Sequence, residues 1–176
     1  GFTTWTRGLA WAIAGFAEEL EWLNTASEEE LKHVGNKEAL TAFMMKAAKA
    51  TCDFYIEHTP IDGIPYWDTG APNIDKISDY LNKPADPFNE FEPVDSSAAA
   101  IAAQGLLRLG KLLIDKNDKS GQQYWQSGLT VINTLLDEPY LSKNPDHQGL
   151  ILHSIYHHPN GWDYIPKGSK IPNGES

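Results

Sequence analysis

The chain has 176 residues, of which 41% are hydrophobic and 22% charged, a composition typical of one globular domain. Its formal net charge of -10 argues against nucleic acid as a partner, because nucleic-acid binding requires a basic face. The single cysteine, Cys52, excludes an internal disulfide. No apolar run reaches the roughly 18 residues of a membrane span, so no membrane contact is expected.

Four long helices are predicted from apolar residues that recur at intervals of three and four. They span residues 6–23, residues 37–58, the stretch from the capping signal Asp95-Ser96 to residue 114, and residues 120–136. Cys52 falls on the second pattern and is expected to be a buried, unreactive thiol. No convincing strand is predicted, although residues 150–152 are compatible with a short one. The acidic run at residues 28–30 is interpreted as a solvated helix start.

The predicted helices alternate between two kinds, which indicates a ring of paired helices. Ala12-Ile13-Ala14-Gly15 in the first helix recurs as Ala100-Ile101-Ala102-Ala103 in the third, and small residues on nearly all sides allow close packing. The second and fourth helices are bulkier and more one-sided. An inner-outer-inner-outer order with a repeated pair is typical of an all-α toroid.

Two inner and two outer helices do not close a ring, because each inner helix needs an inner neighbour on both sides. We therefore expect residues 1–176 to form a single unit that is incomplete on its own. The expected fold is about half of an (α/α)6 barrel, its C-terminal portion. The missing N-terminal half would be supplied by the same protein or by a partner chain.

The loops indicate where function is concentrated. The long connections, residues 59–94 and the stretch from residue 137 onward, both follow outer helices and are expected on the rim that holds the N-termini of the inner helices. Arg7 lies on that rim as well. Helix N-termini carry partial positive charge and free amide groups, which favour an anionic ligand.

An arginine between two tryptophans, Trp5-Thr6-Arg7 and Trp11, stands at the start of the first helix. Arginine binds a carboxylate through two parallel hydrogen bonds, and tryptophan offers a flat apolar face. Trp11 lies one turn after Arg7, so both can project from the same side. The pattern predicts a site for a flat anionic ligand such as a uronic acid. The alternative is a structural arginine beside core tryptophans.

Two carboxylates stand in turn-forming or capping contexts. Asp68, within the segment 62–72, is expected to accept backbone amides in a rigid turn, with Trp67 filling the rim. Asp95, followed by two serines, is most simply a helix cap. An acid/base pair formed by these two carboxylates is the functional alternative, although nothing in their spacing requires it.

A histidine-rich segment follows the fourth helix and contains His153, His157 and His158. Its spacing matches no established metal site, so neither a metal nor another cofactor is expected. Polar contacts with a ligand are expected instead from Tyr156 and His157.

Four motifs in chain order resemble those of the unsaturated glucuronyl hydrolases, glycoside hydrolase family 88. The stretch Arg7-Gly8-Leu9-Ala10-Trp11 is similar to their Arg-Gly-Gln-Ala-Trp segment, and residues 65–72 are similar to their Trp-Asp-Phe-x-x-Pro loop. Residues 95–102 are similar to their Asp-x-Ser-Ala-Ala-Ala helix start, and residues 153–159 to their His-Gly-Thr-x-His-Lys-Pro stretch.

The chain departs from that pattern at three places. Leu9 replaces the usual glutamine, the loop of residues 73–93 is longer than expected, and His158 stands where a lysine is common.

The resemblance implies a bacterial enzyme of polysaccharide degradation with an (α/α)6 barrel about twice this length. Such enzymes remove a 4,5-unsaturated uronic acid from the non-reducing end of oligosaccharides made by polysaccharide lyases. An aspartic acid protonates the C4–C5 vinyl ether and directs water onto C5, and the resulting hemiketal rearranges and releases the aglycone. No metal is needed.

By the same resemblance, Arg7 would bind the uronate carboxylate or adjacent hydroxyls, and Trp11 would pack on the sugar. The residues expected to bind substrate are Arg7, Trp11, Trp5, Trp67, Tyr156 and His157. The family's two central aspartates have no counterpart here. We therefore expect no catalytic residue in this chain and no hydrolase activity from it alone.

Two other functions are compatible with the sequence. One is that of the related unsaturated rhamnogalacturonyl hydrolases, glycoside hydrolase family 105, which share the barrel and the chemistry. The other is a non-catalytic carbohydrate-binding or scaffold module. The sequence leaves open the aglycone, its sulfation and the compartment, whether cytoplasmic or periplasmic.

Overall fold

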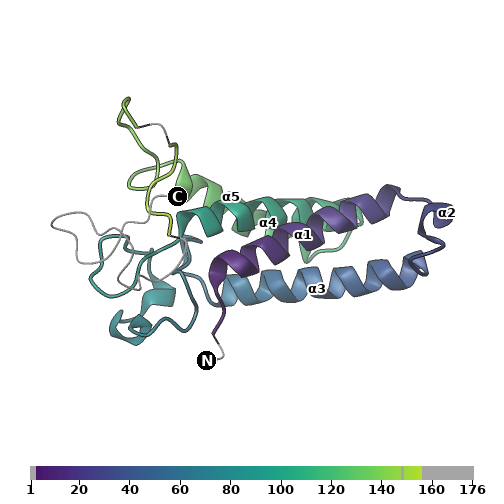
Figure 1. The fold of residues 1–176 in the computed structure, drawn as a ribbon, viewed down its shortest axis with the longest axis horizontal. Coiled ribbons are helices and arrows are strands. Elements are labelled where there is room, and N and C mark those ends of the chain that lie inside the picture. The colour runs from purple at the N-terminus through teal and green to yellow at the C-terminus, as the bar shows by residue number, and fades with distance from the viewer. Residues whose placement is uncertain (1–2, 148, 156–176) are drawn as a thin grey trace.

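The computed structural model describes residues 3–147 and 149–155, and this part of the chain is helical (Figure 1). Its helices are α1 (Thr6–Thr25), α2 (Glu28–Leu31), α3 (Lys37–Glu57), α4 (Ser96–Asp115) and α5 (Gly121–Leu135). Short 3₁₀ turns, η1 (Ile74–Lys76) and η2 (Tyr80–Asn82), lie in the loop before α4. The four predicted long helices are confirmed. In the described residues, β-type pairing is limited to isolated bridges, including one between Leu141 and Ile151 where a short strand was considered.

Local sequence sets the starts of the helices. The acidic run begins α2 through a capping box, in which Ser27 accepts from the Glu30 amide while the Glu30 carboxylate accepts from the Ser27 amide. Asn36 caps α3 by accepting from the Ala39 amide at 2.9 Å. The predicted cap of α4 is also confirmed, because the Asp95 carboxylate accepts from the first amides of that helix.

Helices α1 and α4 lie in the middle of the bundle and run in the same direction, while α3 packs on α1 and α5 packs on α4 (Figure 1). This is the predicted inner-outer order. The small residues of the inner helices allow a close approach, since a Cβ placed on Gly105 would lie 2.6 Å from the carbonyl oxygen of Ile13. The core between the helices contains Ala10, Ile13, Ala17, Leu20, Ala48, Cys52, Tyr55, Ala98, Ala102, Leu106, Leu109, Leu113 and Tyr124.

The loop of residues 59–94 and a second loop, described at residues 137–147 and 149–155, gather at the end of the bundle where α1 and α4 begin, and α2 lies at the opposite end (Figure 1). We call the first end the rim: the N-termini of α1 and α4 together with these two loops. Hydrogen bonds from α1 to the first loop and from α4 to the second confirm that both share this end.

Helix α4 is long and apolar enough to cross a membrane by length and composition alone. In this fold, however, 56% of its apolar window is buried among the other helices. Its alanines and leucines form the centre of the core. Its composition therefore matches that of a core helix.

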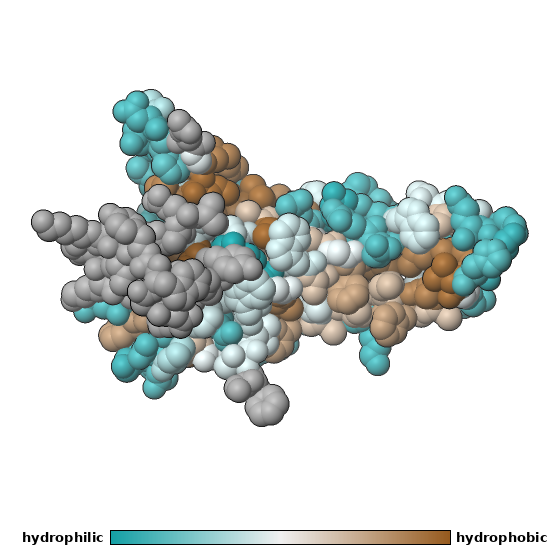
Figure 2. Space-filling model, viewed as in Figure 1, coloured by the Kyte–Doolittle hydropathy of each residue, from teal (hydrophilic) through white to brown (hydrophobic). Residues whose placement is uncertain are grey.

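Large apolar side chains remain exposed along α1 and α3. Trp11 and Trp22 on α1 are 60% and 50% exposed, and Phe43 on α3 is 63% exposed. Figure 2 shows tan to brown surface along the face that carries these two helices. Exposed apolar surface of this kind often marks a contact with another protein segment.

The close approach of α1 and α4 predicts opposite effects for two glycine-to-alanine changes. Gly105→Ala would press a methyl group onto the Ile13 backbone, so we expect it to lower the free energy of unfolding by about 2 kcal/mol or more. Gly15→Ala has nothing within 4 Å of the added Cβ and should raise that free energy by roughly 0.5–1 kcal/mol. Urea unfolding of the two variants measures both values, and equal effects would contradict this packing.

The buried position of Cys52 predicts a slow reaction with thiol reagents. Burial, followed by the nearby charge of Asp53, raises the pKa of the Cys52 thiol to about 12. Because the thiolate is the reactive form, modification at neutral pH should be slower by orders of magnitude in the folded chain than in urea. Absorbance of a released aromatic thiol gives both rates, and similar rates would show that Cys52 is accessible.

Candidate functional site

The segment around Trp67 lies across the first turn of α1. The Thr6 amide donates to the Trp67 carbonyl at 3.0 Å, and the Thr6 hydroxyl donates to the carbonyls of Tyr66 and Trp67. Trp5 forms an isolated bridge with Asp68. These bonds satisfy donors at the helix start that have no partner within the helix. They also bring two of the predicted site residues, Trp5 and Trp67, to the same part of the rim.

Arg7 is buried and forms an ion pair with Asp95, 88 residues further along the chain. Its Nε donates to Asp95 Oδ2 at 3.0 Å and its Nη2 donates to Asp95 Oδ1 at 2.9 Å, the two-bond geometry typical of arginine and carboxylate. Nη2 also donates to the Ile155 carbonyl at 2.8 Å. Arg7 is 7% exposed and Asp95 is fully buried. The arginine therefore grips a carboxylate that belongs to the protein itself.

The ion pair gives Arg7 a structural role, as in the alternative raised for it, but Trp5 and Trp11 are exposed and are not core residues. A direct contact between Arg7 and a uronate stays a prediction.

Asp95 joins both inner helices to the second loop. Besides the arginine, Oδ1 accepts from the amides of Ser97 and Ala98 at 3.1 and 3.2 Å. It also accepts from the amide of Ile155 at 3.4 Å. The Ser96 hydroxyl and amide donate to Leu152 and His153 in the same loop. A carboxylate at this point is favourable because two parallel helices present their positive ends together.

Asp68 performs the role expected from its turn context. It is 6% exposed, and its Oδ1 accepts from the Gly70 amide at 2.9 Å. Its backbone carbonyl accepts from the amide of Ala71. These bonds make Asp68 part of a rigid turn, as the sequence indicated.

The three predicted tryptophans differ in how much surface they present. Trp11 is 60% exposed and Trp5 36%, whereas Trp67 is half-buried, with its indole Nε1 donating to Glu92 Oε2 at 2.8 Å. All three stand on or next to the N-terminal turns of α1. The rim thus carries aromatic faces beside the Arg7–Asp95 ion pair, a combination that suits a sugar ring.

The predictions for Tyr156 and His157 lie outside the described residues. His153 is described, and its ring packs edge-on against Phe88 and Tyr140 at centroid distances of 5.1 and 5.9 Å. Its carbonyl accepts from the Ser96 amide at 3.1 Å. Within residues 3–147 and 149–155, no group of three or more His, Cys, Asp or Glu side chains is placed to hold a metal ion.

Sequence reasoning missed Glu92, a fully buried carboxylate in the loop of residues 59–94. Its oxygens accept from the Trp67 indole and from the amide and side chain of Asn73. No periodic pattern points to this residue, because it lies in an irregular polar stretch. A glutamate just before Pro93 was the only available signal.

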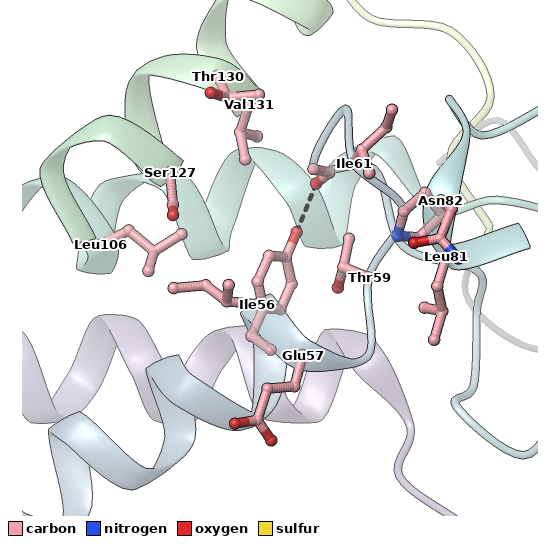
Figure 3. A pocket seen from close by; sticks show the side chains of 13 residues that line it. Ile56, Glu57, Thr59, Ile61, Leu81, Asn82, Leu106, Ser127, Thr130 and Val131 are labelled. Atoms are coloured by element: carbon pink, nitrogen blue, oxygen red, sulfur yellow. Dashed lines mark hydrogen bonds between the residues drawn. The ribbon is translucent and has the colours of Figure 1, made fainter. Parts of the chain in front are cut away.

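A separate cavity of about 450 Å³ lies between the end of α3, the residues that follow it, η2 and α5 (Figure 3). Tyr55 is one of its lining residues and donates to the Gly63 carbonyl at 2.8 Å. Burial, and then the charges of Asp95 and Asp62, raise the pKa of Tyr55 well above its ordinary value. Trp5, Arg7, Trp11 and Trp67 are not among the lining residues, so the cavity is distinct from the candidate site.

Two curated proteins named unsaturated glucuronyl hydrolase are similar to this chain. The one from Formosa agariphila is 32% identical over 171 residues, which cover 96% of this chain and 32% of that protein. The one from Bacillus sp. strain GL1 is 31% identical over 155 residues, which cover 88% of this chain and 33% of that protein. The chain is a homologue of the unsaturated glucuronyl hydrolases.

Solved structures of unsaturated glucuronyl hydrolases share the fold. The crystal structure of the Bacillus sp. GL1 protein, 29% identical, matches 89% of this chain and 33% of its own, with a TM-score of 0.61. A variant of the Streptococcus agalactiae protein, 21% identical, matches 98% of this chain and 36% of its own, with a TM-score of 0.64. The chain matches no protein-family model.

The chain spans about a third of the length of the unsaturated glucuronyl hydrolases that it matches. This corrects the expected share of about half. Two inner-outer pairs, α1 with α3 and α4 with α5, are a third of the six pairs in an (α/α)6 barrel. The resemblance and the fold class, part of an α/α barrel, are confirmed. That residues 1–176 form a unit that is incomplete on its own stays a prediction.

The geometry around Asp95 predicts that its ion pair with Arg7 and its cap of α4 contribute separately to the free energy of unfolding. Asp95→Ala leaves the Arg7 guanidinium buried without its carboxylate, and we expect a loss of about 3–5 kcal/mol in the free energy of unfolding. Asp95→Asn keeps a cap acceptor and should lose roughly 1 kcal/mol less. Urea unfolding measures the two values.

Asn36→Ala is the matched control, because it removes the cap of α3 at the end of the bundle far from the rim. It should cost about 1 kcal/mol. If Asp95→Ala costs no more than this control, the ion pair contributes nothing beyond capping.

Proposed function

We propose that this chain forms part of a glycoside hydrolase that removes a 4,5-unsaturated uronic acid from the non-reducing end of lyase-generated oligosaccharides. The observation that carries the proposal is the identity of 31–32% with two curated unsaturated glucuronyl hydrolases, which extends over 88–96% of this chain. The chain's share of the enzyme would be two inner-outer helix pairs and the rim at their N-terminal ends.

The composition of the rim supports a sugar ligand. Trp5 and Trp11 present indole surface beside the buried Arg7–Asp95 pair, and Trp67 lies against the first turn of α1. Aromatic faces pack against the apolar face of a sugar ring. A relative 27% identical to this chain has been solved with the oligosaccharide dGlcA-Glc-Rha-Glc. We propose that the same kind of ligand binds across this rim.

The carboxylates of the rim support the proposal that acid/base chemistry is supplied from elsewhere. A general acid must reach the atom that it protonates. Asp95 is fully buried and holds Arg7 and three backbone amides, and Asp68 is buried within its own turn. We therefore assign neither residue to protonation of the vinyl ether. The aspartates that protonate substrate would come from the remaining part of the barrel.

The exposed apolar side chains support the need for further helix pairs. Trp22 and Phe43 are each half or more exposed on the flank formed by α1 and α3. In a closed ring every inner helix is covered on both sides, so this flank would pack against another inner-outer pair. The partner that we propose is the rest of the same kind of barrel.

The proposed function predicts inactivity of the chain alone and activity of a suitable chimera. In the chimera, this chain replaces the matching third of the Bacillus sp. GL1 protein. We expect the chimera to decrease the ultraviolet absorbance of unsaturated disaccharides, and the isolated chain to leave it unchanged, because the catalytic aspartates lie outside this chain.

Lyase digests of glycosaminoglycan, ulvan and pectin serve as substrates. Activity of the chain alone would contradict the absence of catalytic residues. A folded chimera that leaves all digests intact would contradict the proposed function, and activity on pectin digests alone would favour the rhamnogalacturonyl alternative. Binding of saturated and unsaturated sugars alike, without hydrolysis, would favour a binding module.

A further inference from the structure

Glu92 stands out among the residues that the proposed reaction does not use. It is 0% exposed, and burying a carboxylate is costly unless hydrogen bonds compensate the lost water. Oε2 accepts from the Trp67 indole Nε1 at 2.8 Å. Oε1 accepts from the Asn73 amide at 2.7 Å and from Asn73 Nδ2 at 3.0 Å. One side chain therefore binds two other positions of the loop of residues 59–94, Trp67 and Asn73, through three hydrogen bonds.

The backbone of Glu92 is itself fixed by Asn89. Asn89 Oδ1 accepts from the Glu92 amide at 2.9 Å, and Asn89 Nδ2 donates to the Glu92 carbonyl at 2.7 Å. The carboxylate is thus held at a defined position before any ligand arrives. Such preorganisation is what a binding site needs from the residues that support it.

Trp67 is held at its backbone and at its indole edge. Its carbonyl accepts from the amide of Thr6 at 3.0 Å, and its amide donates to the Pro93 carbonyl at 3.1 Å. The bond from its Nε1 to Glu92 then restricts the rotation of the ring. Since that bond uses the indole N–H, the ring offers a ligand its apolar face and no hydrogen-bond donor.

We propose that Glu92 is a positioning residue that orients the Trp67 indole as one wall of the sugar site at the rim. The ligand class is the unsaturated uronide of the proposed function, on which this inference rests. The indole contacts the apolar face of the ring and makes no hydrogen bond to its carboxylate. Because Glu92 is 0% exposed, its negative charge is kept out of contact with an anionic sugar.

Hydrogen exchange of indole N–H groups in the full chain tests the orientation. Trp67→Phe identifies the Trp67 signal in a nitrogen–proton correlation spectrum, and Trp22→Phe identifies a reference indole that is half exposed at the far end of α1. We expect the Trp67 indole to exchange at least about tenfold more slowly than that of Trp22. Equal exchange overturns the proposal. This measurement needs no substitution at Glu92. It therefore tests whether the Trp67 indole is held in place even if a variant at Glu92 does not fold.

Glu92→Gln tests the effect of the carboxylate on ligand binding. Glutamine has one acceptor oxygen, whereas the Trp67 indole and Asn73 donate to two carboxylate oxygens of Glu92. The indole N–H of Trp67 should therefore exchange faster in this variant. The affinity for an unsaturated glucuronyl disaccharide should fall by about tenfold. Glu57→Gln, which removes the same charge from an exposed position at the end of α3, should change neither value. The affinities are measured by calorimetric titration of the full chain.

The outcomes separate this inference from the proposed function. If the unchanged chain binds the unsaturated disaccharide but Glu92→Gln does not weaken that binding, the positioning role is overturned and the proposed function stands. If the unchanged chain binds no saccharide, the proposal that this chain carries a sugar-binding rim fails, and the role of Trp67 in binding fails with it. Faster exchange and weaker binding together support the inference.

Discussion

The rim depends on the buried ion pair between Arg7 and Asp95. Helices α1 and α4 run in parallel, so their positive ends meet at one place, and an arginine in the first turn of α1 adds further positive charge. Asp95 compensates the end of α4 and the charge of Arg7, because it caps α4 and accepts two hydrogen bonds from the guanidinium. The same pair binds both the amide and the carbonyl of Ile155. The second loop is thereby fixed to both inner helices.

This constraint also explains how a site is assembled at the rim. The first turn of α1 is held from one side by the backbone of Trp67 and from the other by Asp95. The exposed tryptophans stand next to this fixed point, and the buried Glu92 accepts a hydrogen bond from the indole N–H of Trp67. Homology with the unsaturated glucuronyl hydrolases and the aromatic surface of the rim therefore point to the same end of the bundle.

Most of the helical architecture was accessible from the sequence. The recurrence of apolar residues placed the long helices, and the alanine-rich repeat distinguished inner from outer helices, because close packing of two helices requires small side chains. The cap at Asp95 was readable for a similar reason, since capping is a local interaction with the next few amides. The order of helices and loops then placed both long loops at one end.

The candidate site was less accessible, because its contacts join residues far apart in the chain. The sequence by itself determined where the long helices lie and which faces are small enough to pack closely, and for Arg7 it predicted a ligand's carboxylate. Only the tertiary structure decided that Arg7 pairs with Asp95, 88 residues away, and that Glu92 rather than a periodic position supports Trp67. The physical reason is that the path of irregular loops determines which groups can hydrogen-bond to a buried charge, and local residue propensities do not predict that path.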